Sequence, residues 1–198
     1  MYTVIGSPRT RAMRVYWILE EMGVDYEMNL APPRSDAVRA INPTGKVPCL
    51  LVDDTPIYDS IAIMQFLADR HEQLTYPAGT IERAIQDSYT QFCVDEIEGP
   101  LWMAAKNTFI HPEELRVPAI KPTARHEFAN AMQTLEDRLG DNAFVMGDKI
   151  TVPDILLGHC ANWAQAAKFD LPEGKVGAYF ARLLERPALQ RAREKTDY

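Results

Sequence analysis

The feature that most constrains the fold is a change of pattern partway along the 198-residue chain. Over about the first 75 residues, short β-prone runs alternate with segments of helical spacing, and beyond them only helical spacing is found. Strands are predicted at YTVI, VDYEMNL, CLLV and PIY, and helices at RTRAMRVYWILEEMG, SDAVRAI and DSIAIMQFLADR. The order β-α-β-α-β-β-α predicts two parallel-strand units followed by a hairpin, forming a mixed sheet covered by helices.

The polar connector HEQLTYPAG marks the boundary between the two patterns. After it, a long helix is predicted over residues 80–110, with a kink at Gly99-Pro100 because proline cannot donate a helical hydrogen bond. Three further helices are predicted within residues 121–140, 150–169 and 175–187. We therefore expect an α/β domain of thioredoxin-like architecture over residues 1–76 and an all-α domain over residues 82–198.

Charge and composition exclude several classes of protein. The chain carries 21 basic and 28 acidic residues, a net charge of −7, and its basic residues form no run, so nucleic-acid binding is not expected. It has no apolar stretch of about 20 residues, so no membrane span is expected, and no secretory signal is visible. Three scattered cysteines in apolar surroundings indicate reduced, buried thiols of a cytoplasmic protein. No metal site is expected, because the four histidines have no cysteine or carboxylate at ligand spacing.

The loop after the first predicted strand, GSPRTR, is the first candidate site. It opens at a helix N-terminus, where backbone N–H groups and the helix dipole favour negative charge. In a thioredoxin-like architecture this position carries C-x-x-C, whereas here Ser7 and Thr10 have the same spacing. Hydroxyl groups cannot exchange disulfides, but they can donate hydrogen bonds to a ligand's thiolate and lower the pKa of that thiol. Simple capping of the helix is the alternative interpretation of both residues.

The stretch NPTGKVPCL holds two prolines and a glycine directly before a predicted strand. A proline cannot donate to a sheet, and the bond before a proline is the one peptide bond for which the cis form is accessible. We expect Val47-Pro48 to be cis, which would leave the backbone N–H and C=O of Val47 exposed. An extended peptide could then pair with Val47 as an added strand.

A further candidate site lies at Asp59-Ser60, where a short predicted strand meets a helix. Ser60 and the helix N-terminus suit a carboxylate, and Asp59 suits an ammonium group. Together with the thiolate donor and the peptide-pairing edge, these residues indicate a small, zwitterionic thiol peptide as the ligand.

The chain resembles the cytosolic glutathione transferases over nearly its whole length. The resemblance rests on four features in order: Ser7-Pro8 after the first strand, Asn42-Pro43-x-Gly45-Lys46-Val47-Pro48, Asp59-Ser60, and Gly147-Asp148-x-x-Thr151-x-x-Asp154-Ile155. It implies an N-terminal thioredoxin-like domain followed by an all-helical glutathione transferase domain. It also implies glutathione as co-substrate, no metal, and a homodimer.

The resemblance also implies roles for individual residues. Ser7 is similar in position to the catalytic serine of the theta, delta and tau classes. Val47 would pair with the cysteinyl backbone of glutathione next to Pro48, and Asp59 and Ser60 would hold its γ-glutamyl end. The usual pair there is Glu-Ser, so Asp59 departs from the family pattern.

Two basic residues near these motifs have open interpretations. Lys46 would neutralise the glycyl carboxylate of glutathione, or it is a solvated loop lysine. Arg11 would add positive potential near the thiolate, or it solvates the helix surface.

The resemblance implies a site for a small hydrophobic electrophile between the domains, on the long second-domain helix. The candidates by position are Trp102, Met103, Lys106 and Phe109, with ordinary packing as the alternative. The late motif at Thr151 and Asp154 reads as a capping box whose role is in folding, so neither residue is a site candidate.

The expected reaction is conjugation of the glutathione thiolate, stabilised by Ser7, to an electrophilic carbon. Two alternatives stay open. One is a non-catalytic ligand-binding or interaction protein of the same fold. The other is a glutathione-dependent isomerase of the zeta type, although the S-S-C-x-x-R loop of that class is absent from this sequence.

Overall fold

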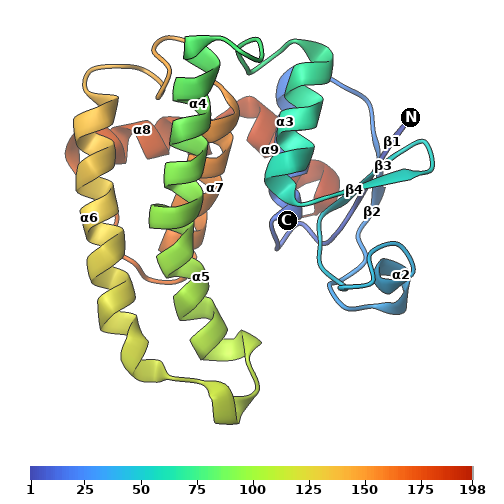
Figure 1. Cartoon of the computed structure of the whole chain (residues 1–198), viewed down its shortest axis with the longest axis horizontal. Coiled ribbons are helices and arrows are strands. Elements are labelled where there is room, and N and C mark those ends of the chain that lie inside the picture. The colour runs from blue at the N-terminus through green and yellow to red at the C-terminus, as the bar shows by residue number, and fades with distance from the viewer. Residues whose placement is uncertain (198) are drawn as a thin grey trace. The chain divides into compact units, whose positions relative to one another are not determined.

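The computed structural model describes residues 1–197, which form two compact units (Figure 1). The first unit comprises Met1–Ala78 together with residues 185–197, and the second comprises Gly79–Leu184. The division near residue 78 lies in the predicted connector. The last stretch of the chain packs with the first unit, whereas the predicted second domain extended to the C-terminus.

A four-stranded mixed sheet forms the centre of the first unit, with the strand order β2-β1-β3-β4. Its strands are β1 (Tyr2–Ile5), β2 (Glu27–Asn29), β3 (Cys49–Val52) and β4 (Thr55–Tyr58). The helices of this unit are α1 (Ala12–Met22), α2 (Asp36–Arg39), α3 (Ser60–His71) and α9 (Pro187–Thr196). These elements confirm the predicted order β-α-β-α-β-β-α and the predicted thioredoxin-like architecture.

The direction of β3 corrects one expectation. β1 and β2 are parallel, but β3 runs antiparallel to β1, with Ile5 opposite Cys49, and β4 runs antiparallel to β3. Only the first strand-helix-strand segment is therefore a parallel unit. The second connection, over residues 30–48, is long enough for a crossover, but it contains only the four-residue helix Asp36–Arg39 and leads into a strand antiparallel to β1.

Alternate residues of the central strands face two separate layers of the first unit. Ile5 and Cys49 pack with Val38 of α2 in one buried cluster. Their neighbours Val4 and Leu50 are fully buried on the opposite face, because successive strand residues point to opposite sides of a sheet. Helices α1 and α3 contact the strands there and pack against each other.

Helix α9, which the sequence pattern did not predict, packs along α1. Its side chains approach two acidic residues at the end of α1. Glu20 accepts from Arg191 Nε at 3.0 Å and also from Lys195, while Glu21 accepts from Arg186. Burial alone would raise the pKa of Glu20, but hydrogen bonds from Lys195, Tyr26 and Arg191 together lower it.

The second unit is all helical. Its helices are α4 (Ile81–Phe92), the π-helix η1 (Cys93–Glu98), α5 (Gly99–Ala105), the π-helix η2 (Lys106–Ile110), the short 3₁₀ turns η3 (Glu113–Leu115) and η4 (Pro118–Ile120), α6 (Lys121–Leu139), α7 (Val152–Ala166) and α8 (Gly174–Leu184). In Figure 1, α6 runs alongside the continuous α4–α5 segment, and residues 106–120 connect them at one end.

A kink was predicted at Gly99-Pro100, and what the structure has at this position is a change of helix type. The π-helix η1 ends at Glu98, and α5 begins at Gly99 with Pro100 in its first turn. Pro100 has no N–H to donate to the carbonyl four residues earlier, so the regular ladder cannot continue through it. A π-helical turn accommodates this interruption without ending the long helix.

The predicted capping box at the start of α7 is confirmed. Asp154 is fully buried and accepts four hydrogen bonds. The donors are Val145 N at 3.0 Å, Thr151 N at 2.8 Å, Thr151 Oγ1 at 2.9 Å and Tyr179 Oη at 2.7 Å. Both carboxylate oxygens are thereby used within the core of the second unit.

Candidate active site

Gly6, at the end of β1, fixes the loop that carries Ser7. Its N–H donates to Asn29 O at 2.9 Å, and its C=O accepts from Tyr16 Oη at 2.8 Å. Its φ is +143°, and a Cβ added there would lie 2.9 Å from the Cβ atoms of both Ala12 and Val47. Only glycine fits this position, and the close contact brings the first loop directly against Val47.

The two hydroxyl groups of this loop differ in what they contact. Thr10 Oγ1 donates to Ser7 O at 2.7 Å and accepts from Ala12 N at 3.2 Å, so it closes the turn before α1. Ser7 is half-buried, and within residues 1–197 nothing hydrogen-bonds to its Oγ or its backbone N–H. The loop therefore leaves Ser7, rather than Thr10, with donors available to a ligand.

The Val47-Pro48 bond is cis, as predicted. Pro48 is buried and Val47 is half-buried, and no other described residue pairs with the backbone N–H or C=O of Val47. An extended peptide could pair with these two groups as an added strand.

The turn before Val47 is held by a buried side chain. Asn42 is only 6% exposed, and its Nδ2 donates to Lys46 O at 3.0 Å while its Oδ1 accepts from Thr44 N at 3.2 Å. Gly45 has φ +68°, and a Cβ there would lie 3.1 Å from the Cα of Arg34. The prolines and the glycine of NPTGKVPCL thus form a single turn that leads into Val47.

Asp59 and Ser60 lie at the start of α3 and have different contacts. Asp59 Oδ1 caps the helix, accepting from Ile61 N at 2.9 Å and Ala62 N at 3.3 Å. Asp59 itself has φ +70° and is exposed. One of its oxygens is therefore used by its own helix, while no described residue donates to Oδ2.

The sequence reasoning missed Arg14, which lies behind Ser60. Arg14 is fully buried in α1, and its Nη1 donates to Ser60 Oγ at 3.2 Å. Because arginine has no acceptor, Ser60 Oγ must accept in this contact, and its own O–H is left to donate to a ligand. The only sign in the sequence was a lone arginine within the apolar run AMRVYWIL, and such an arginine is equally consistent with a surface position.

The two basic candidates are near these groups in sequence but differ in exposure. Lys46 is exposed directly before Val47, and Arg11 is half-buried directly before α1. Ser7, Thr10, Arg11, Lys46, Val47, Pro48, Asp59 and Ser60 all belong to the first unit.

The electrophile candidates all belong to the second unit, on α5 and η2. Trp102 packs edge-to-face on Trp163 with ring centroids 6.2 Å apart. Met103 is 40% exposed and Phe109 is 63% exposed, while Lys106 is half-buried. Trp102 thus has a packing role within the second unit, while the exposed side chains of Met103 and Phe109 are accessible to a ligand.

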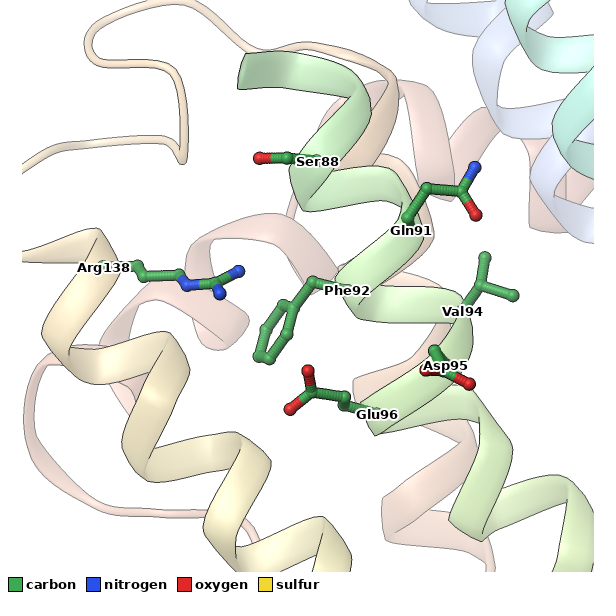
Figure 2. Close-up of a pocket in the computed structure, with 7 residues that line it drawn as sticks. All are labelled: Ser88, Gln91, Phe92, Val94, Asp95, Glu96 and Arg138. Atoms are coloured by element: carbon green, nitrogen blue, oxygen red, sulfur yellow. The ribbon is translucent and has the colours of Figure 1, made fainter. Parts of the chain in front are cut away.

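A separate open pocket of about 410 Å³ lies on the second unit (Figure 2). Its lining residues are Ser88, Gln91, Phe92, Val94, Asp95, Glu96 and Arg138. The guanidinium of Arg138 lies over the Phe92 ring, 4.4 Å from its centroid. None of the predicted electrophile residues lines this pocket.

Residues 1–197 contain no group of three or more His, Cys, Asp or Glu side chains placed to hold a metal ion. Over the same residues, none of the helices combines the length and apolarity that a membrane crossing requires.

Comparisons with known proteins show the family of the chain. Residues 10–70 match the family described as glutathione S-transferase, N-terminal domain, and residues 100–187 match glutathione S-transferase, C-terminal domain. The chain is 33% identical over 198 residues to glutathione S-transferase GstA of Escherichia coli O157:H7, with 94% of each chain covered.

Solved structures show the same architecture. A glutathione transferase from Methylococcus capsulatus superposes with a TM-score of 0.84 at 26% identity, covering 100% of this chain and 99% of that one. The transferase URE2P6 of Phanerochaete chrysosporium, in complex with oxidized glutathione, gives 0.81 at 25% identity, covering 99% and 96%. The chain therefore belongs to the glutathione S-transferase family.

Proposed function

We propose that the protein is a glutathione transferase that conjugates the thiolate of glutathione to small hydrophobic electrophiles. The observation that carries the proposal is the Ser7 hydroxyl, which is half-buried, has no partner among the described residues and lies one residue from the Gly6–Val47 contact. Glutathione paired with the Val47 backbone would place its cysteinyl sulfur next to Ser7. A hydrogen bond from Ser7 favours the thiolate and lowers the pKa of the bound thiol.

The remaining contacts support a zwitterionic peptide. The Ser60 hydroxyl would donate to the γ-glutamyl carboxylate, with the buried Arg14 charge behind it. Asp59 Oδ2 would accept from the γ-glutamyl ammonium, and Lys46 would lie near the glycyl carboxylate. Arg11 would add positive potential close to the sulfur. Thr10, whose O–H donates to Ser7 O, would act by holding the loop.

In catalysis, binding would orient the thiolate towards the electrophilic carbon, and the lowered thiol pKa would supply the nucleophile. A pKa lowered by about 2 units raises the thiolate fraction near neutral pH by up to about 100-fold. Met103 and Phe109 offer exposed apolar surface for the electrophile, with Trp102 and Lys106 beside them. We also propose a cytoplasmic location, which three buried cysteines without a disulfide favour.

Ser7→Ala tests the proposal, with Thr10→Val as the matched control. We expect Ser7→Ala to lower kcat/KM with a chloro-nitro-aromatic electrophile by about 10- to 100-fold, while glutathione affinity changes only a few-fold. Thr10→Val should keep kcat/KM within about threefold, because its hydroxyl acts within the turn.

Equal activity in Ser7→Ala and the unmodified protein would contradict the role of Ser7. If Thr10→Val alone loses activity, Thr10 is the thiolate donor instead. Retention on immobilised glutathione without any turnover would indicate a ligand-binding protein, and isomerisation of maleylacetoacetate would indicate the zeta-type alternative.

We further propose that the protein is a homodimer with a second copy covering α4. Ile81 and Ile85 lie one turn apart on this helix and are 76% and 47% exposed. Ser88, Asp95 and the buried Phe92 follow at the same helical spacing and line the pocket in Figure 2. Sizing should give about twice the chain mass of 22.4 kDa, falling to one chain in Ile81→Glu. A monomer for the unmodified protein would contradict this.

A further inference from the structure

The hydrogen bond between Tyr16 and Gly6 determines how the next peptide group is oriented. Tyr16 is fully buried in α1, and its Oη donates to Gly6 O at 2.8 Å. Burial raises the pKa of the Tyr16 phenol, so the group stays protonated and remains a donor at ordinary pH. The Gly6 carbonyl is thereby held towards the interior of the first unit.

The Gly6 carbonyl belongs to the same peptide group as the N–H of Ser7. This peptide is trans, because the bond between Val47 and Pro48 is the only cis bond among the described residues. In a planar trans peptide the C=O and N–H point in opposite directions. Holding Gly6 O inward therefore turns the Ser7 N–H outward, and no described residue accepts a hydrogen bond from it.

Two further contacts prevent this peptide from rotating. Gly6 N donates to Asn29 O at 2.9 Å, which fixes the preceding peptide. The α-carbon of Gly6 packs so closely on Val47 that an added Cβ would lie 2.9 Å from the Val47 Cβ. The outward N–H thus lies beside the backbone edge to which the cysteinyl group of glutathione would pair.

We propose that the Ser7 backbone N–H is a second donor to the glutathione thiolate, and that Tyr16 is the positioning residue that aims it. The inference rests on the proposed function, since it concerns the same bound thiolate. Ser7 would then contribute two donors from one residue, its hydroxyl and its N–H. The following residue, Pro8, has no N–H to offer.

The test is the titration of the bound thiol, followed by the ultraviolet absorbance of the thiolate at saturating glutathione. Tyr16→Phe removes only the hydroxyl and keeps the buried ring. We expect the pKa of the bound thiol to rise enough to lower the thiolate fraction at neutral pH by about three- to tenfold. Activity should recover at higher pH, and glutathione affinity should change little.

Tyr179→Phe is the matched control, because it deletes another buried phenol hydroxyl, one that donates to Asp154 in the second unit. It should lower the melting temperature without changing the thiol titration. A purely structural role for Tyr16 predicts the same pattern for Tyr16→Phe, and that result would overturn the inference.

Ser7→Ala separates the two proposals, because it removes the hydroxyl but keeps the N–H. We expect some lowering of the thiol pKa to remain in Ser7→Ala and to be lost in Ser7→Ala/Tyr16→Phe. If Ser7→Ala leaves the pKa of the bound thiol unchanged while Tyr16→Phe raises it, the hydroxyl proposal fails and the N–H inference stands. If the unmodified protein binds no glutathione, or binds it with an unshifted thiol, both fail.

The unmodified protein gives a second readout that does not depend on a folded variant. The Ser7 amide proton should shift downfield in NMR spectra on binding glutathione, following the titration of the thiol. It should not do so with S-methylglutathione, which cannot form a thiolate. The same shift with both ligands would overturn the inference.

Discussion

Helices α1 and α7 begin with similar residues, but these residues differ in whether their hydrogen-bonding groups have partners within the protein. At α7, Asp154 is buried and accepts from Val145 N, Thr151 N, Thr151 Oγ1 and Tyr179 Oη. At α1, Thr10 closes the turn, but the N–H and Oγ of Ser7 have no partners among the described residues. Each start has a threonine in the turn and a buried tyrosine hydroxyl behind it.

The difference shows how to separate a structural motif from a candidate site. Where every donor meets an acceptor inside the protein, the motif stabilises the fold and has nothing left for a ligand. Where the surrounding contacts are complete but two outward donors remain, the same kind of turn can bind an anion. The two regions should therefore respond to substitution in opposite ways, one in stability and the other in chemistry.

Asp154→Ala should have the largest effect on stability. It leaves two buried N–H groups and the Tyr179 hydroxyl without their acceptor, so the free energy of unfolding should fall by at least about 3 kcal/mol. Denaturant unfolding measures this change, and Asp148→Ala, on an exposed aspartate in the preceding turn, is the control. A fall in the free energy of unfolding below about 1 kcal/mol would show that the hydrogen bonds at the start of α7 do not stabilise the fold as proposed.

Glu20→Gln should have a smaller effect, confined to stability. Glu20 is 6% exposed and accepts from Tyr26, Arg191 and Lys195, but both cations are about half exposed. We expect the free energy of unfolding to fall by about 1–2 kcal/mol at neutral pH. Glu27→Gln, on an exposed glutamate of β2, is the matched control and should be neutral.

The pH dependence of Glu20→Gln follows from the lowered pKa of Glu20. A carboxyl group whose pKa is lower in the folded state stabilises the fold above its unfolded pKa, about 4.3. That contribution is lost as the pH falls through the lower folded pKa. The difference between the unmodified protein and Glu20→Gln should therefore shrink in acid, and a constant difference would contradict the ion-pair account of α9.

The sequence was sufficient for features set by local chemistry. The cis bond at Val47-Pro48 and the capping box at Thr151 each depend on a few neighbouring residues, and both are present as predicted. The two hydroxyls of the first loop were also identified. Which hydroxyl is available to a ligand and which closes the turn was not predictable, because it depends on the hydrogen bond from Thr10 Oγ1 to Ser7 O.

Features that depend on distant contacts were not predictable in this way. Arg14 reaches Ser60 across 46 positions of sequence, and its neighbours gave no sign of that partner. Helix α9 has a mostly polar sequence, and its buried apolar residues Ala188, Leu189 and Ala192 are too few to predict it. Arg191 and Lys195 pair with Glu20 across 171 and 175 positions of sequence. The direction of β3 likewise depends on how a long connection folds, for which periodicity carries no information.

The most direct test of the central claim is a crystal structure of the protein with glutathione. The account predicts the cysteinyl group paired with the Val47 backbone and the sulfur within about 3.5 Å of both Ser7 Oγ and Ser7 N. A sulfur that instead lies against Thr10, or away from every donor of the first loop, would contradict it.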